Sequence, residues 1–387
     1  MLDEPIIEHL YVHVPFCARK CAYCAFYSEA GDAALIQRYA EALVREMELV
    51  AADLKPRTIF FGGGTPSLLN LRQWEMIFQA MDRLHLLGAA EWTIECNPAT
   101  VSLDKARLFR QFGVNRISMG AQSFDETLLE KLGRVHSRDM IYRSFDTLRA
   151  AGFDNINIDL MFAIPGQTLD VWRQSLRDAL ALGTEHLSCY EVIYEEDTAL
   201  YEDLQAGRVE VNEDLACAMY EELLGAMESG GFAQYEVANF ARGSTLDTGE
   251  IPARACRHNI NYWRGGSYYG VGPSAAEYVR GARAKNWSNT VLWCEQLEKG
   301  RRAVESTERL EPLARAGELA AFGLRMNAGW PLDKFQARTG FDLRREWRGE
   351  IKKLIDLGYG CFEGGRFHLT RTGMRYADWA AEEFLKV

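Results

Sequence analysis

The chain has 387 residues, of which 48% are hydrophobic and 26% are charged, and its formal net charge at pH 7 is -11. These proportions are those of an ordinary globular protein, and the acidic balance argues against a protein whose main task is to coat nucleic acid or anionic lipid. No apolar run reaches the roughly 20 residues of a membrane-spanning helix. The first residues, MLDEPIIEHLYVHVP, lack the pattern of a signal peptide. We therefore expect a cytoplasmic protein, with peripheral attachment to a membrane left open.

Six short β-like runs alternate with amphipathic, helix-like stretches through the first half of the chain. Alternation of strand and helix at this rhythm predicts a parallel sheet, either in a barrel or doubly wound. The predicted strands are HLYVHVP, TIFFGGG, EWTIECN, RISMGAQ, NINIDLM and HLSCYEV. The predicted helices cover residues 35–52, 71–84, 103–112, 127–132 continuing through 138–151, 171–182 and 215–227.

The alternation stops near Trp287, and the remainder of the chain has a different pattern. Residues 242–254 are polar and rich in turn formers, which predicts a long loop. After residue 287 come helical segments, and then LIDLGYGCFEGGRFHLTRTG predicts a helix, a short hairpin and a turn. The sequence therefore predicts two domains, residues 1–285 and residues 286–387, of which the second is small, helical and winged-helix-like.

Three of the nine cysteines, Cys17, Cys21 and Cys24, lie together in CARKCAYCAF, directly after the first predicted strand. The other six are scattered, which does not suit a disulfide framework, and in a reducing compartment a tight cysteine group is more often a metal or redox site. A cubane iron–sulfur cluster with one open iron would use three thiolates. A zinc site without an obvious fourth ligand, or a redox pair with a bystander, is the alternative. Spacing alone favours the cluster.

Polar and glycine residues gather after the later strands as well. The run FFGGGTPS, residues 60–67, follows the second strand, and glycines let a backbone approach a ligand closely and aim N–H groups at an anion. A tight turn is the structural alternative, and the ending of a P-loop is absent. Glu95, Gln122 and Asp159 fall at or near the carboxyl ends of the next three strands. At one rim of a parallel barrel, such residues together predict a ligand site.

The cysteine spacing C-x-x-x-C-x-x-C, with the aromatic Tyr23 before the third cysteine, resembles the radical S-adenosylmethionine (SAM) superfamily. In that superfamily the three cysteines hold a [4Fe-4S] cluster whose open iron binds SAM. The segments YVHVPFCARKCAYCAF, FFGGGTPS, ISMGAQSF and NIDLMFAIPGQT narrow the resemblance to the oxygen-independent coproporphyrinogen III oxidase group, over nearly the whole chain. The resemblance implies an α/β fold with a partial parallel (β/α)6 radical SAM barrel.

The resemblance also implies site residues. The cluster would be held by Cys17, Cys21 and Cys24. Contacts to the SAM at the cluster would come from Tyr11, Gly63, Glu95 and Ile193. Positions that line a second SAM site, or its edge, in the oxidase match Tyr23, Gly64, Thr65, Gln122, Arg134 and Asp159. In a protein with one SAM, several of these residues would serve that single molecule. Ala25 departs from the group, since relatives often have Asp there.

Three features place the chain nearer to a haem chaperone branch of the group than to the oxidase. The oxidase has a fourth cysteine where this chain has Phe26, and it has a long extension where only ten residues precede Tyr11. The segment RHNINYW, residues 257–263, resembles an H-N-x-x-Y-W motif of the chaperone branch. The branch implies a protein that binds haem and delivers it to haem-requiring respiratory or membrane proteins.

The RHNINYW segment has two interpretations. His258 could ligate haem iron, with Tyr262 and Trp263 against the porphyrin and Cys256 as an alternative ligand. Without the family, a His beside Asn and two aromatic residues is more often a hydrogen-bonded corner of the core.

Other functions are alternatives. The competing function is oxidative decarboxylation of coproporphyrinogen III, so the sequence leaves open whether the protein is an enzyme. It also leaves open whether the protein forms a homodimer. Nucleic-acid binding through the tail is disfavoured, because its basic residues alternate with acidic ones, as in FDLRREWRGEIKKLIDL.

Overall fold

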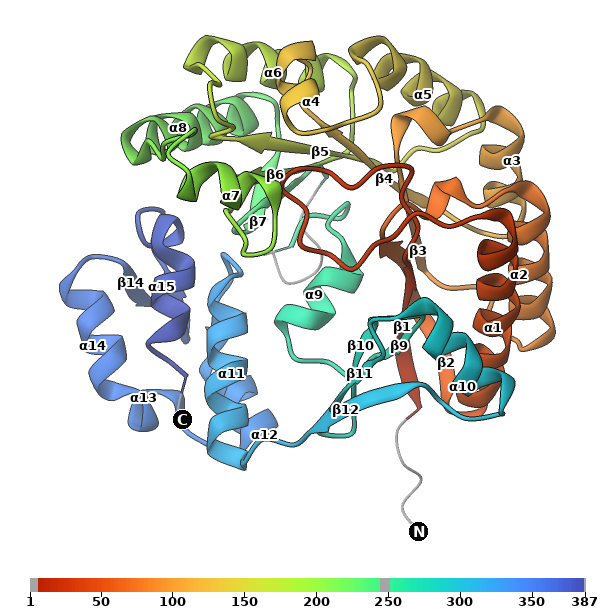
Figure 1. The fold of residues 1–387 in the computed structure, drawn as a ribbon. Coiled ribbons are helices and arrows are strands. Elements are labelled where there is room, and N and C mark those ends of the chain that lie inside the picture. Colours follow the sequence, from red (N-terminus) through yellow and green to blue (C-terminus); the bar gives the residue numbers. More distant parts are fainter. Residues whose placement is uncertain (1–5, 244–250, 386–387) are drawn as a thin grey trace.

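A nine-stranded, mostly parallel sheet forms the larger part of the protein (Figure 1). The computed structural model describes residues 6–243 and 251–385. Within these residues the strand order is β7-β8-β6-β5-β4-β3-β2-β1-β9, so the sheet has two edges and does not close into a barrel. Neighbouring strands from β6 to β9 pair in parallel, whereas β8 and β7 add an antiparallel edge beside β6.

The six predicted strands and the α/β fold are confirmed. The strands are β1 (Ile7–Val14), β2 (Leu54–Gly63), β3 (Glu91–Cys96), β4 (Arg116–Gln122), β5 (Ile156–Phe162) and β6 (His186–Glu191). Buried apolar side chains alternate along these strands with buried polar ones, such as Thr93, Ser118 and Asn157. One face of the sheet therefore packs in the apolar core and the other is polar.

Helices connect these strands and lie around the outside of the curved sheet (Figure 1). They are α1 (Ala33–Val50), α2 (Leu71–Arg83), α3 (Leu103–Gln111), α4 (Glu126–Lys131), α5 (Arg138–Ala150), α6 (Leu169–Ala181), α7 (Ala199–Gln205) and α8 (Glu213–Ser229). Their starts follow from local chemistry, because Asp32, Asn70 and Thr168 each accept a hydrogen bond from a backbone N–H of the first helical turn. Such caps stabilise a helix by about 1 kcal/mol each.

The segment after α8 adds elements that the sequence did not predict, apart from α10, which lies among the helical segments expected after residue 287. They are β7 (Ala233–Glu236), β8 (Asn239–Ala241), α9 (Arg257–Trp263), β9 (Tyr269–Val271), β10 (Ala276–Val279), β11 (Ala282–Asn286), α10 (Thr290–Glu298) and β12 (Val304–Glu308). β9 extends the large sheet beside β1, and β10, β11 and β12 form a small antiparallel sheet. Part of the predicted loop 242–254, residues 244–250, lies outside the described residues.

The core of the large sheet includes fully buried Trp74, Trp92, Trp172 and Trp293. Burying a large apolar side chain contributes about 1.5–3 kcal/mol. Trp293 belongs to α10, so residues beyond Trp287 still complete this core. A second hydrophobic cluster begins at Ala316. The predicted domain boundary between residues 285 and 286 stays a prediction.

The second cluster is the core of the C-terminal part. Its elements are α11 (Pro312–Leu324), β13 (Trp330–Pro331), α12 (Leu332–Thr339), α13 (Leu343–Glu346), α14 (Arg348–Asp356), β14 (Gly360–Glu363), β15 (Arg366–Leu369) and α15 (Ala377–Glu382). The hairpin of β14 and β15 and the short β13 form a three-stranded antiparallel sheet beside the helices. This agrees with the small helical C-terminal part and the hairpin predicted from the sequence.

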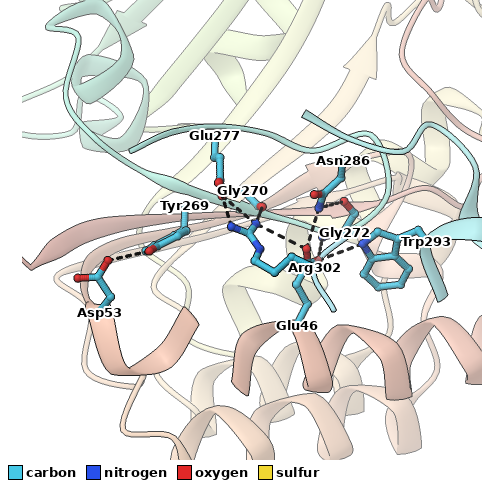
Figure 2. Close-up of polar contacts among 9 residues, drawn as sticks. All are labelled: Glu46, Asp53, Tyr269, Gly270, Gly272, Glu277, Asn286, Trp293 and Arg302. Carbon is cyan, nitrogen blue, oxygen red and sulfur yellow. Dashed lines mark hydrogen bonds and ion pairs between the residues drawn. The ribbon is translucent and has the colours of Figure 1, made fainter. Parts of the chain in front are cut away.

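A buried polar network fixes β9 and α10 against α1 (Figure 2). The carboxylate of Glu46, which is fully buried in α1, accepts hydrogen bonds from the N–H of Gly272 at 2.7 Å, from Asn286 Nδ2 at 2.8 Å and from Trp293 Nε1 at 3.1 Å. The guanidinium of Arg302 lies 3.6 Å from the same carboxylate and forms a bidentate pair with Glu277 at 2.9 Å. These contacts join segments more than 200 residues apart. In the described part of the chain, no helix is both long and apolar enough to cross a membrane.

Candidate functional site

A cavity of about 490 Å³ opens at the carboxyl ends of the parallel strands. Its wall takes residues from the loop after β1, from the ends of β2, β3, β4, β5 and β6, and from the segment between α4 and α5. This is the rim where parallel α/β enzymes bind their ligands. Of the fourteen predicted cluster, SAM and haem residues, twelve line it: Cys17, Cys21, Tyr23, Cys24, Gly63, Gly64, Thr65, Glu95, Gln122, Arg134, Asp159 and Ile193.

Backbone hydrogen bonds hold the cysteine loop in place at several points. The N–H of Cys17 donates to the carbonyl of Glu29 at 3.1 Å, and the N–H of Ala22 donates to the carbonyl of Leu132 at 3.0 Å. The carbonyl of Ala22 in turn accepts from the N–H of Leu200 at 2.9 Å. The three cysteine side chains are half-buried and form no disulfide, so the loop presents its thiols to the cavity from a fixed backbone.

The glycine run is required by packing as well as by the cavity. Gly63 has a φ of +103°, and a Cβ there would lie only 2.5 Å from the imidazole of His13. A Cβ on Gly64 would lie 2.8 Å from the carbonyl oxygens of Val14 and Phe16. The run therefore lets β2 approach β1 and the start of the cysteine loop, and it leaves the N–H of Gly63 to donate to Glu95 Oε2 at 3.2 Å.

Two carboxyl groups, Glu95 and Asp159, face the cavity in an environment that disfavours their charge. Burial, together with the neighbouring charge of Asp159, raises the pKa of Glu95 to about 8. Burial also raises the pKa of Asp159, although hydrogen bonds from Asn157 at 2.7 Å and Ser118 at 3.3 Å partly oppose this. A cation placed between these groups would stabilise their ionised forms.

Arg134 connects the cysteine loop with the end of β4. Its Nη2 donates to the carbonyl of Gly120 at 2.6 Å and its Nη1 lies 3.5 Å from Cys21 Sγ, as a donor to sulfur. Its buried Nε has no hydrogen-bond partner among the described residues. Arg134 lines the cavity, so its guanidinium brings positive charge to a wall that also carries the two carboxyl groups.

Tyr11 is not among the described residues that line the cavity. Its hydroxyl forms a hydrogen bond with His13 Nδ1 at 3.0 Å, and burial raises its pKa. The predicted contact of Tyr11 with SAM stays a prediction.

Sequence reasoning missed the residues that hold Asp159. Asn157 donates to Asp159 Oδ1 and to Ser118 Oγ, each at 2.7 Å. The imidazole of His186, which is fully buried, is hydrogen-bonded to Asn157 Oδ1 at 2.7 Å. The signal was available, because Asn157 stands two residues before Asp159 in the same strand and so points to the same face of the sheet.

The predicted haem motif forms α9, whose first residues are held by Glu91. The carboxylate of Glu91 accepts from the backbone N–H groups of Arg257 at 2.9 Å and His258 at 3.0 Å. His258 is fully buried, and its ring nitrogens contact Thr58 Oγ1 and Tyr262 Oη, each at 2.7 Å. Burial lowers the pKa of His258 to about 3. To coordinate iron, this imidazole would have to give up one hydrogen bond.

Cys256 and Trp263 differ from the motif's other residues in their surroundings. Cys256 is fully buried, and burial raises the pKa of its thiol to about 12, so it is a poor thiolate donor. Trp263 is half-buried, and the guanidinium of Arg325 lies 4.8 Å from its ring centroid.

The residues of the cavity fit an iron–sulfur cluster with SAM. In the described part of the chain, no three His, Cys, Asp or Glu side chains are grouped tightly enough for a single metal ion. The three thiols instead share one cavity wall, which suits a cubane because each cysteine then binds a different iron. The guanidinium of Arg134 and the two carboxyl groups on the wall suit a ligand that carries both a carboxylate and positive charge.

The comparisons with known proteins agree with the fold. The family model of the Radical SAM superfamily matches residues 11–179, and that of the HemN C-terminal domain matches residues 310–376. Membership of the radical SAM superfamily implies a [4Fe-4S] cluster and SAM. Among solved structures, coproporphyrinogen III oxidase (HemN) from Escherichia coli has a TM-score of 0.85 over 100% of this chain and 92% of that chain, at 20% identity.

Curated relatives narrow the family. The chain is 32% identical to "Heme chaperone HemW" of Lactococcus lactis over 387 residues, which cover 100% of this chain and 98% of the relative. It is also 32% identical to the protein of the same name in Bacillus subtilis over 373 residues, which cover 95% and 96% of the two chains. The chain belongs to the HemW family of the radical SAM superfamily.

Proposed function

We propose that the protein is a haem chaperone that carries a [4Fe-4S] cluster and SAM, binds haem, and delivers it to haem-requiring respiratory or membrane proteins. The observation that carries the proposal is the convergence of the cysteine loop, the glycine run and two buried carboxyl groups on one cavity in a chain of the HemW family. Haem binding rests on the name of the relatives. A homodimer and attachment to a membrane surface stay predictions.

We assign the residues of the cavity as follows. Cys17, Cys21 and Cys24 hold the cluster, which when bound can supply an electron to SAM. Gly63 and Glu95 lie beside the amino group of SAM, because the carboxyl of Glu95 faces the cavity and already accepts from the N–H of Gly63. The remaining predicted SAM residues on the wall, Tyr23, Gly64, Thr65, Gln122, Arg134, Asp159 and Ile193, form the rest of the pocket.

Phe26 stands where the oxidase has a fourth cysteine, and its side chain is 69% exposed at the edge of the cavity. An exposed aromatic ring here cannot supply a thiolate. This feature favours the chaperone over the oxidase.

Cluster binding is tested with Cys24→Ala and a matched control, Cys361→Ala. Both cysteines are half-buried, but Cys361 lies in β14, outside the wall of the cavity. After anaerobic reconstitution we expect Cys24→Ala to lose most of its iron and sulfide, while Cys361→Ala keeps the wild-type content. Equal cluster content in the wild type and Cys24→Ala would contradict the assignment.

The function itself is tested by titrating the reconstituted wild-type protein with haemin, with and without SAM. We expect saturable haem binding and, with coproporphyrinogen, a reductant and SAM, no formation of protoporphyrinogen. Absence of haem binding together with turnover of coproporphyrinogen would replace the chaperone by the oxidase.

His258→Ala examines the predicted iron ligand separately. A shifted Soret band with normal cluster content would support that role, and an unchanged spectrum and affinity would make His258 a structural residue.

A further inference from the structure

A second cavity, of about 310 Å³, lies at the other end of the strands from the cysteines. One wall comes from the amino-terminal parts of β1 and β2 and from the residue before β3, and the other comes from α9 and the residue after it. The lining residues are His9, Arg57, Thr58, Ala90, Arg257, Ile260, Asn261 and Arg264. We refer to it as the arginine cavity.

The arginine cavity is positive within an acidic protein. It is lined by Arg57, Arg257 and Arg264, and none of its described lining residues carries a carboxylate, although the chain as a whole has 55 acidic and 44 basic residues. Burial lowers the pKa of His9 to about 4, so the positive charge at neutral pH comes from the guanidinium groups. Guanidinium groups pair with carboxylate or phosphate oxygens in a forked geometry.

Two carboxylates close to the arginine cavity, Glu8 and Glu91, are not among its lining residues. Glu8 lies 3.6 Å from Arg57, and the side chains of both residues are largely exposed, at 49% and 69%. Such an exposed pair contributes little and does not prevent Arg57 from binding another anion. Glu91 is occupied by the backbone N–H groups at the start of α9.

Parts of the wall are held before any ligand arrives. Arg264 Nη1 donates to the carbonyl of Gly329 at 2.6 Å, and its guanidinium lies 5.1 Å from the ring centroid of Trp330. Thr58 Oγ1 is hydrogen-bonded both to His9 Nδ1 at 2.8 Å and to His258 Nδ1 at 2.7 Å. Thr58, which lines the arginine cavity, is therefore in direct hydrogen-bond contact with His258, the predicted haem ligand.

We infer that the arginine cavity binds the carboxylate side chains of a porphyrin, an inference that rests on the proposed function. Its volume is at the lower end for a ligand pocket, which suits carboxylate side chains with the remainder of the ligand outside. Haem offers two propionates, which match a cavity whose charge comes from several arginines. A haem bound here would contact α9, and His258 of this helix is hydrogen-bonded to Thr58 of the cavity wall.

The test compares haem with its dimethyl ester, in which both carboxylates are blocked. The variant is Arg57→Gln with Arg257→Gln, because both residues are exposed and neither has a described role in packing. The control is Arg83→Gln with Arg208→Gln, which removes the same charge from exposed arginines that pair with Glu48 and Asp203. We expect the wild type and the control to bind haem about tenfold or more tightly than the ester, as charge-assisted hydrogen bonds allow. We expect the cavity variant to lose most of that preference.

The outcomes separate this inference from the proposed function. If the wild type binds haem and the ester equally well, the chaperone function stands and the arginine cavity is not the carboxylate site. A preference that persists in the cavity variant overturns the inference in the same way. If the wild type binds neither porphyrin, both proposals fail. A titration with inorganic phosphate then shows whether the cavity binds a small anion instead.

Discussion

Glu46 and Glu95 are both carboxyl groups in the interior, but the structure surrounds them in opposite ways. Glu46 is fully buried and has three hydrogen-bond donors and a guanidinium around it (Figure 2). Glu95 accepts one described hydrogen bond, from Gly63, and faces an open cavity. A carboxylate whose partners are complete holds the fold together, whereas one with missing partners beside open space is available to a ligand.

The largest expected effect is a loss of stability when the hydrogen-bond network around Glu46 is broken. Glu46→Ala leaves the N–H of Gly272, Asn286 Nδ2 and Trp293 Nε1 without this acceptor. Arg302 keeps its pair with Glu277. We expect the free energy of unfolding to fall by about 3–5 kcal/mol, because each buried donor left without an acceptor costs about 1–3 kcal/mol. Denaturant titration measures this. Glu46→Gln, which keeps the shape, should lose less, and equal stability of Glu46→Ala and the wild type would contradict a structural role.

Replacing Glu95, the carboxyl group of the cavity, should raise the stability of the ligand-free protein at high pH, whereas replacing Glu46 lowers it. Because the pKa of Glu95 in the folded protein is about 8, above the ordinary value near 4.3, its contribution to stability is full at low pH and is lost as the pH rises toward 8. Glu95→Gln cannot acquire that charge. At about pH 9 we therefore expect the ligand-free variant to be more stable than the wild type by roughly 2–4 kcal/mol, and at about pH 3, where the carboxyl is protonated in both the folded and the unfolded state, we expect no difference. Denaturant titrations at the two pH values measure this.

SAM binding provides the second half of the same test. We expect Glu95→Gln to weaken SAM binding about tenfold or more, since a charged acceptor for the amino group becomes neutral. Glu46→Gln serves as the control and should bind SAM like the wild type once folded. If Glu95→Gln destabilises the protein as much as Glu46→Ala and binds SAM normally, the distinction between the two groups is wrong.

The sequence could predict the parts of the molecule that depend on local pattern. The strands β1 to β6 and the helices between them have clear periodicity and caps, and the ends of parallel strands meet at one rim. That rule alone is enough to bring Glu95, Gln122 and Asp159 to one site. The cysteine spacing depends on a single loop and was equally accessible.

Other features depend on contacts between distant segments. β9 has only three residues and pairs Tyr269 with Leu10, so no local pattern marks it. The network of Glu46 and Arg302 joins positions 256 residues apart, and the clash between a Cβ on Gly63 and His13 appears only once β1 and β2 are paired. The two interpretations of His258 could not be separated from the motif alone, because its hydrogen-bond partner Thr58 lies 200 residues earlier.

The smallest expected effect is the pH dependence of SAM affinity, and it isolates the charge of Glu95. With a pKa of about 8 in the ligand-free protein, Glu95 is mostly protonated at pH 7 and mostly ionised at pH 9. SAM brings positive charge and should bind the ionised form better, so the affinity should rise by up to about tenfold from pH 7 to pH 9 and level off above that.

Calorimetric titrations in buffers of different ionisation enthalpy should show proton release on binding near pH 7. In Glu95→Gln both the slope and the proton release should disappear, whereas protons that SAM itself exchanges are common to both proteins and cancel in the comparison. An identical pH profile in the two proteins would mean that Glu95 does not sense the ligand and that Asp159, the other carboxyl group of the cavity with a raised pKa, should be examined in its place.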